Sequence, residues 1–176
     1  MNNLGFTDDD RRIVAEQLGR EPRGLVGVAA RCECGVPLVV TTAPRLPDGT
    51  PFPTLYYLTH PALSAAVARL EADGWMRDLN ERLATDQSLA DRYQAAHLAY
   101  LADRAKVAQI LGLAEVSEIA GISAGGMPNR VKCLHALAGH ALAAGNGVNP
   151  IGDQVLAELG WPPDKCWCDP ATPQIP

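Results

Sequence analysis

The sequence predicts an α+β fold, with a small three-stranded antiparallel sheet followed by a predominantly helical remainder, about five helices in all. Two short runs rich in β-branched residues lie close together at 25–30 and 36–41, and a third lies at 54–59. From residue 61 onward, apolar residues recur at helical spacing instead. The chain has 176 residues, 47% of them hydrophobic and 20% charged. It can therefore bury one sizeable core, and residues 1–176 are predicted to form a single domain.

The first predicted element is a helix over about residues 8–19. Thr7 is a suitable N-cap, and the three aspartates after it place negative charge at the helix start, where the helix dipole favours it. Gly19 then ends the helix. We interpret the aspartates as helix-start charges rather than as metal ligands.

The first two predicted strands form a hairpin whose tip is the sequence RCECG at 31–35. Cys32 and Cys34 therefore lie at this tip. A proline-rich segment at 43–53 leads to the third strand, which ends at His60. Because proline cannot donate a hydrogen bond to a neighbouring strand, this segment is predicted to lie outside the sheet interior.

The helices of the remaining chain are predicted from their start and stop signals. Proline at a first helical position, an Asn-Pro start and glycines at helix ends mark their boundaries. They cover about residues 61–74, 86–111, 130–140 and 149–160. His97 has no clustered partner and is predicted to lie on the surface of the second of these helices. The last residues, 161–176, contain too much proline for regular structure and are predicted to form an irregular tail that carries Cys166 and Cys168.

Charge and composition exclude several classes of function. A net charge of -5 argues against general nucleic-acid binding, which requires a basic surface. The start MNNLGFTDDDRR lacks a basic region followed by an apolar run, and no later run is long enough to span a bilayer, so we expect neither secretion nor membrane insertion. A cytoplasmic location is predicted. There, five cysteines are more often free, metal-bound or catalytic than paired in disulfides.

Cysteines and histidines gather where the predicted elements begin or end. Such positions can bring thiolates and imidazoles together at a zinc or iron–sulfur centre. On an ideal helix Cys133 and His140 share one face but lie about 10.5 Å apart, whereas a later helix start would let Cys133 and His135 converge. The alternative is that Cys133 is a buried apolar residue and one histidine is a hydrogen-bonded core residue. The candidate metal ligands are Cys32, His60, Cys133 and His140, with His135 and Cys34 as alternates.

A glycine-rich loop at 123–129 leads into the predicted helix that carries these residues. Gly125 and Gly126 would expose backbone N–H groups at the helix start, and Arg130 and Lys132 would add positive charge, which predicts binding of an anionic small molecule such as phosphate. The loop is not a Walker motif. The alternative is an ordinary Gly-Gly turn followed by solvated basic side chains.

Four long strings in the chain are similar to a known family. They are QLGREPRG at 17–24, TAPRLPDGTPFPTLYYLTHP at 42–61, RLEADGWM at 69–76 and SAGGMPNRVKCLHALAGHALA at 123–143. On these strings the chain resembles the actinobacterial proteins catalogued as domain of unknown function five-zero-one. The resemblance covers most of the chain and implies no established activity. Genes of the family often lie near those for enolase, a septum-formation initiator and an exopolyphosphatase, which implies a housekeeping or cell-envelope context.

The resemblance also extends to individual residues. Some relatives have cysteine where this chain has His60, an exchange that suits a metal ligand better than a packing position. Cys34 and the tail pair Cys166 and Cys168 lie outside the family pattern. The positions that match the pattern are Cys32, His60, Cys133, His135 and His140.

Three functions therefore follow from the sequence, in decreasing order of support. The first is a domain that binds zinc or an iron–sulfur cluster through a Cys/His constellation. The second is an enzyme that acts on a phosphate or thiol substrate through Cys133, His135 or His140, with Arg130 and Lys132 holding the substrate. The third is an interaction module for a cell-division protein, in which the cysteines only maintain the shape.

Overall fold

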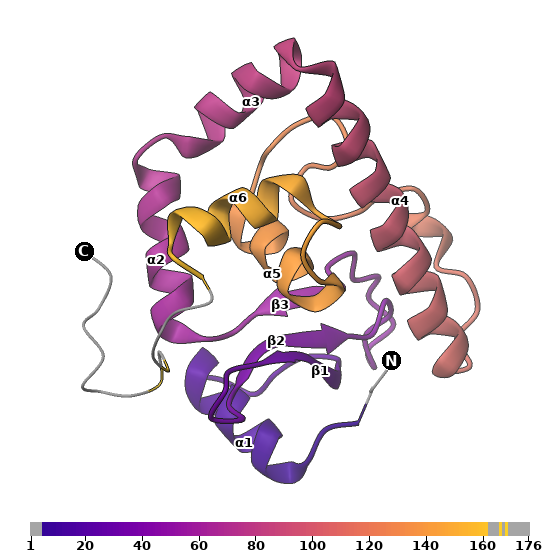
Figure 1. Cartoon of the computed structure of the whole chain (residues 1–176). Coiled ribbons are helices and arrows are strands. Elements are labelled where there is room, and N and C mark those ends of the chain that lie inside the picture. Colours follow the sequence, from indigo (N-terminus) through magenta and orange to yellow (C-terminus); the bar gives the residue numbers. More distant parts are fainter. Residues whose placement is uncertain (1–4, 162–165, 167, 169–176) are drawn as a thin grey trace.

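The computed structural model describes residues 5–161, 166 and 168, and Figure 1 shows how its elements are arranged. One helix precedes a three-stranded sheet, and all other helices follow it, so the fold is α+β as predicted. Within the described residues there are six α-helices, one more than expected. The elements are α1 (Asp8–Leu18), β1 (Leu25–Arg31), β2 (Pro37–Thr42), β3 (Tyr56–Leu58), α2 (Pro61–Ala72), α3 (Trp75–Thr85), α4 (Gln87–Ile110), the short 3-10 helix η1 (Ser117–Ile119), α5 (Leu134–Ala144) and α6 (Pro150–Glu158). Apart from positions 161, 166 and 168, the predicted tail at 161–176 lies outside the described residues.

The sheet is antiparallel, with β2 between β1 and β3. Every residue of β2 is buried. Helix α1 contacts β2, and α5 contacts all three strands. Figure 1 shows α1 below the sheet and α5 above it. The central strand is therefore an uninterrupted apolar and threonine run because it is covered on both faces.

Helices α2, α3 and α4 surround α5 and α6 on three sides, and the sheet lies along the fourth (Figure 1). Helices α5 and α6 pack closely against each other. Gly152 in α6 permits this approach, because a Cβ added there would overlap the backbone carbonyl of Leu137 and lie 2.7 Å from the Cβ of Ala141. The interior therefore depends on a small residue at the point where the two helices cross.

Helix α3 was not predicted from the sequence. Gly74 adopts a left-handed conformation, with φ of 90°, but it separates α2 from α3 rather than leading into a loop. Trp75, Leu79 and Leu83 recur at helical spacing and all contact the main hydrophobic core. The predicted end of α2 at Gly74 agrees with the structure, and the amphipathic pattern after Gly74 corresponds to α3.

The predicted start of the next-to-last helix at Arg130 is wrong, because α5 begins at Leu134 and Cys133 before it has an extended conformation. The side chain of Asn80 in α3 accounts for the difference. Its Nδ2 donates to the carbonyl oxygen of Val131 at 2.8 Å, and the Val131 N–H donates to its Oδ1 at 2.8 Å. These bonds replace the helical hydrogen bonds of that residue, so the helix starts later.

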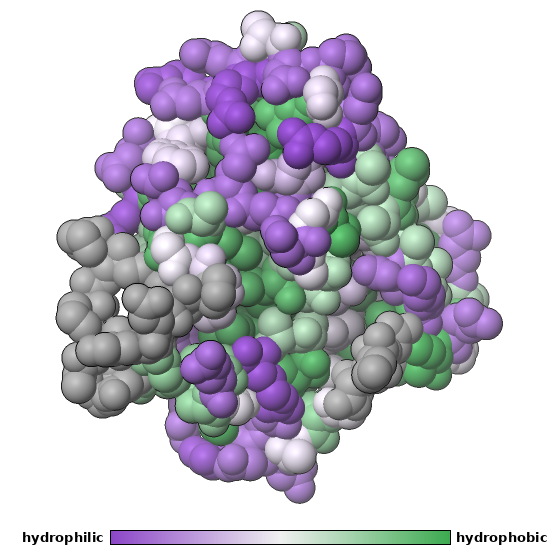
Figure 2. Space-filling model, viewed as in Figure 1, coloured by the Kyte–Doolittle hydropathy of each residue, from purple (hydrophilic) through white to green (hydrophobic). Residues whose placement is uncertain are grey.

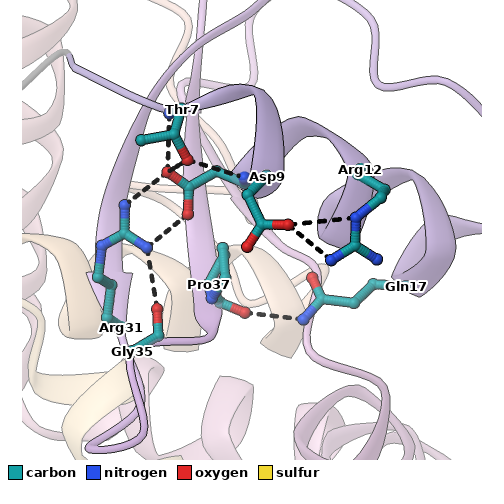
Figure 3. A network of polar contacts seen from close by, with 8 residues as sticks. Thr7, Asp9, Arg12, Gln17, Arg31, Gly35 and Pro37 are labelled. Carbon is teal, nitrogen blue, oxygen red and sulfur yellow. Dashed lines mark hydrogen bonds and ion pairs between the residues drawn. The ribbon is translucent and has the colours of Figure 1, made fainter.

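Polar side chains connect α1 to the cysteine-bearing tip of the hairpin (Figure 3). The guanidinium of Arg31 donates to both carboxylate oxygens of Asp10, at 2.6 and 2.9 Å, and to the carbonyl oxygen of Gly35 at 2.9 Å. Hydrogen bonding from Arg31 holds the pKa of Asp10 well below its usual range. Gln17 donates to the carbonyl oxygen of Pro37 at 2.9 Å. The turn is therefore held on both sides by one helix.

The surface is uneven in polarity. Figure 2 shows hydrophilic residues over α3 and apolar residues around the centre of the same face. Among the described residues, the large apolar side chains that remain exposed lie mainly on α4 and the segment after it, at Leu98, Ile110, Leu111 and Ile122, with Tyr57 in β3. None of the described helices combines the length and the apolar character that crossing a membrane requires.

Candidate metal centre

Four cysteines meet at the hairpin tip. The Sγ atoms of Cys32, Cys34, Cys166 and Cys168 all lie within 4.8 Å of one another. The Sγ atoms of Cys32 and Cys166 are 3.2 Å apart, which is much longer than a disulfide bond of about 2.05 Å. Zinc binds thiolates at about 2.3 Å in a tetrahedron, which places the sulfur atoms about 3.8 Å from one another. The four thiols therefore have the spacing of ligands around a single metal ion.

The first two cysteines are positioned by the β-turn that joins β1 to β2. The N–H of Cys32 donates to the carbonyl oxygen of Val36 at 2.9 Å, and the N–H of Gly35 donates to that of Cys32 at 2.8 Å. Gly35 has φ of 87°, a conformation that residues with a Cβ adopt at a cost. This turn directs Cys32 inward, where it is 7% exposed, while Cys34 remains exposed.

The other two cysteines come from the C-terminal segment. Cys166 and Cys168 are partly buried and pack against the main hydrophobic core. They have the same C-x-C spacing as the pair on the hairpin. The centre thus joins two short motifs that are 134 residues apart in sequence.

His60 lies beside this cluster and is 4% exposed. Its Nδ1 accepts a hydrogen bond from the N–H of Leu63 at 3.3 Å, because His60 is the N-cap of α2. An accepting Nδ1 in a neutral imidazole places the proton on Nε2. That Nε2 is 3.2 Å from the Sγ of Cys168, and burial lowers the pKa of His60, which favours the neutral ring. The geometry therefore directs an N–H of His60 at a sulfur atom of the cluster.

The acidities of three of these thiols reflect burial and crowding. Burial raises the pKa of Cys32 and of Cys168, whereas the contact with Cys32 lowers the pKa of Cys166 to about 7. Thiolates this close repel one another, so they cannot all ionise without a neighbouring cation. A bound divalent cation would supply the compensating charge.

The structure divides the predicted ligands among three places. Cys32, its alternate Cys34 and His60 lie at the cysteine cluster. Cys133 and His135 form a second group with Glu71 in α2. The third place is the core position of His140 in α5. The later start of α5 allows Cys133 and His135 to approach each other, which is the alternative that the sequence left open.

His140 is fully buried and makes contacts typical of a core residue. Its Nδ1 is 3.1 Å from the Nδ2 of Asn149, and its ring packs against Tyr56 and Tyr100 at centroid distances of 5.9 and 5.1 Å. Its Nε2 has no hydrogen-bond partner among the described residues. His97 is buried as well, with Nδ1 2.8 Å from the Oγ of Ser123, so the predicted surface position of this residue is wrong.

Burial lowers the pKa of His140 from 6.5 to about 4, so acid should destabilise the fold through this residue. Below pH 6.5 the unfolded chain binds a proton that the folded chain excludes, and stability is lost as the pH falls to about 4. The full effect is about 3 kcal/mol. We expect His140→Gln, which cannot titrate, to have a flatter dependence of unfolding free energy on pH between 6.5 and 4. Urea unfolding of both proteins at several pH values measures this dependence. The same pH dependence in the two proteins would contradict a lowered pKa of His140 as its cause.

Backbone hydrogen bonds within the glycine-rich loop join its two ends. Gly125 and Gly126 have φ of 68° and 93°, and a Cβ on Gly126 would lie 2.5 Å from the carbonyl oxygen of Arg130. The N–H of Lys132 donates to the carbonyl oxygen of Gly125 at 2.7 Å, and the N–H of Arg130 donates to that of Gly126 at 3.1 Å. The two glycines therefore meet a conformational requirement of the turn.

The start of α5 already holds an anionic group from the protein itself. The N–H of Leu134 donates to Oε1 of Glu71 at 2.6 Å. This carboxylate lies at the start of α5, four residues after the helix start at Arg130 where the sequence predicted a bound phosphate. Arg130 and Lys132 are exposed and precede the helix instead of lying in its first turn. The interior of the glycine loop and the helix start are thus occupied by the chain's own groups.

Sequence reasoning left the role of the tail cysteines open, although one signal could have identified them. The chain contains two C-x-C motifs, CEC at 32–34 and CWC at 166–168. Two cysteine pairs of matching spacing are the usual composition of a four-thiolate site.

Comparison with known proteins identifies one family. No curated protein and no solved structure matches the chain. The family described as "Protein of unknown function (DUF501)" matches residues 28–157. This segment includes Cys32 and Cys34 and ends before Cys166 and Cys168, so half of the cysteine cluster lies beyond the match. Because the match covers well over half of the residues, this chain belongs to the DUF501 family.

Proposed function

We propose that this protein is a zinc-binding domain in which Cys32, Cys34, Cys166 and Cys168 hold one Zn²⁺ ion. The observation that carries the proposal is the convergence of four Sγ atoms within 4.8 Å of one another. Four thiolates fill the tetrahedral coordination of zinc, so no position is left for substrate or water. The ion therefore has a structural role.

The compactness of the cluster supports zinc over an iron–sulfur centre. An iron–sulfur cluster contains several iron and sulfide atoms, and cysteines that surround it must stand farther apart than ligands of one ion. The contact of 3.2 Å between Cys32 and Cys166 is too close for thiolates on opposite sides of such a cluster. A single tetrahedral ion requires only small movements of these side chains.

His60 supports the metal centre from outside the coordination sphere in this proposal. Its Nδ1 is engaged with the N–H of Leu63, and its Nε2 faces Cys168. A hydrogen bond from Nε2 to a coordinated thiolate would stabilise the negative charge on sulfur and hold the side chain in place. The ion would thus connect the β1–β2 turn, the start of α2 and the C-terminal segment.

Metal analysis of protein purified without chelator, under reducing conditions, tests this function. We expect close to one zinc per chain and a colourless protein. Cys34→Ala and Cys166→Ala should each remove most of the metal, because a three-thiolate site binds zinc much more weakly. Cys133→Ala is the matched control and should retain it, since Cys133 belongs to the separate group with Glu71.

Three results would contradict the proposal. The first is a folded protein without metal that remains unable to bind added zinc. The second is loss of the metal in Cys133→Ala with retention in Cys166→Ala, which would favour the ligand set predicted from the sequence. The third is a brown protein that contains iron, which would indicate an iron–sulfur centre instead of zinc.

A further inference from the structure

A second reactive group lies away from the four-cysteine cluster. Glu71 in α2, Cys133 and His135 in α5 each present one atom, a carboxylate oxygen, Sγ and a ring nitrogen, and these atoms all lie within 4.8 Å of one another. Cys133 is the N-cap of α5, and its side chain caps none of the helix N–H groups. All three residues are half-buried.

The surroundings of His135 indicate its protonation state. Its Nδ1 is 3.2 Å from Oε1 of Glu71, and its Nε2 is 3.0 Å from the carbonyl oxygen of Ser64. Both neighbours are hydrogen-bond acceptors, because Glu71 Oε1 also accepts the N–H of Leu134 as a carboxylate would. A neutral imidazole has only one N–H and would leave a lone pair facing an oxygen. The doubly protonated, positively charged ring satisfies both contacts.

This arrangement also affects Cys133. A thiol beside an imidazolium and at the start of a helix ionises more readily than an isolated one. The closeness of the His135 ring lowers the pKa of Cys133, and the same contact raises the pKa of His135 to about 9. Glu71 opposes the first effect and strengthens the second. With both ring nitrogens facing oxygen atoms, His135 presents no free lone pair to a metal.

We propose that Cys133 and His135 form a thiolate–imidazolium pair that reacts with small-molecule disulfides by thiol–disulfide exchange. The Sγ of Cys133 attacks one sulfur of the disulfide, and a new S–S bond forms as the original S–S bond breaks. The departing sulfur leaves with the bonding electron pair as a thiolate and takes a proton from water. The products are a mixed disulfide on Cys133 and a free small-molecule thiol, while His135 remains an imidazolium held by Glu71. Glu71 is a positioning residue that holds the imidazolium through Nδ1.

The proposal is tested with zinc-loaded protein and dithiodipyridine, a neutral aromatic disulfide. The rate of modification at Cys133 is followed by peptide mass mapping between pH 5 and pH 10 for the wild type and for His135→Gln. We expect the wild-type rate to reach half its maximum at a lower pH than the variant, whose midpoint should move to the usual thiol range of about 8.5. At pH 7 the variant should react about five- to tenfold more slowly, since a more basic thiolate partly compensates through higher nucleophilicity.

A merely structural role of His135 would not move the midpoint, so equal midpoints in the two proteins would overturn the proposal. If His135→Gln does not fold, the wild type alone decides, because a midpoint at or above pH 8.5 contradicts a pre-formed thiolate. Metal content provides a further check. Two zinc ions per chain, one of which disappears in Cys133→Ala, would identify this group as a second metal site instead. If the four cysteines bind no metal but Cys133 reacts with the expected pH profile, the zinc proposal fails and the thiolate–imidazolium proposal holds.

Discussion

Removal of the metal is expected to lower the melting temperature of this protein by about 10 °C. Zinc that binds the folded state alone stabilises it by about 4 kcal/mol when the free metal is a thousandfold above its dissociation constant. A change of 1 kcal/mol shifts the melting temperature of a chain of this size by about 2–4 °C. The loss should be large because the proposed ion would join residues 134 positions apart, on the hairpin and near the C-terminus. Calorimetric scans with and without a chelator measure it.

Two variants make this measurement specific. Cys34→Ala should already have the lower melting temperature and should not respond to the chelator. Cys133→Ala should respond as strongly as the wild type, because this residue lies in the separate group with Glu71. A chelator-induced decrease of the same size in Cys34→Ala would show that the stabilising ion binds elsewhere.

The substitution Gly152→Ala is expected to destabilise the fold by about 2–3 kcal/mol. Alanine is the better helix former by about 1 kcal/mol, so an increase in stability would be predicted from the helix alone. The added methyl group would instead overlap the carbonyl of Leu137 and crowd Ala141, which are in the facing helix α5. Separating the helices would also lengthen the contact from Asn149 Nδ2, at the N-cap of α6, to His140 Nδ1 in α5, now 3.1 Å. Overpacking of a well-filled interior carries a cost of this size.

Gly139→Ala is the matched control. Gly139 is also a buried helical glycine, but the nearest atom to an added Cβ is the carbonyl oxygen of Tyr56 at 3.6 Å, an ordinary van der Waals contact. We expect this variant to be as stable as the wild type or up to about 1 kcal/mol more stable. Denaturant unfolding of both variants measures the difference. A Gly152→Ala variant as stable as Gly139→Ala would contradict this expectation and would mean that the helix crossing at Gly152 can relax.

Helix boundaries set by neighbouring residues could be predicted from the sequence. The N-cap at Thr7, Pro61 at the first position of α2 and the Asn149-Pro150 start of α6 are all confirmed. Capping involves hydrogen bonds over three or four residues, so the whole interaction is visible in a short string. The start of α5 could not be found in this way. It depends on Asn80, whose side chain bonds to Val131 from a position 51 residues away.

The candidate metal centre also depends partly on local sequence and partly on long-range packing. The sequence by itself determined that Cys32 and Cys34 lie at a hairpin tip and that the chain carries thiols and imidazoles suited to a metal. Only the tertiary structure decided which of them converge. Sγ atoms 134 residues apart meet because Cys166 and Cys168 pack against the same hydrophobic core as Cys32.

The same long-range packing separated residues that the sequence had grouped together. His140 is carried into the core because it lies on the inner face of α5, between two tyrosines. Cys133 and His135 precede it by seven and five residues, and they lie beside Glu71 of α2 instead. A local pattern specifies the type of each element and the face on which a residue lies. The residues that contact this face are determined by the packing of the elements. That packing minimises exposed apolar surface over the whole chain rather than over any short segment.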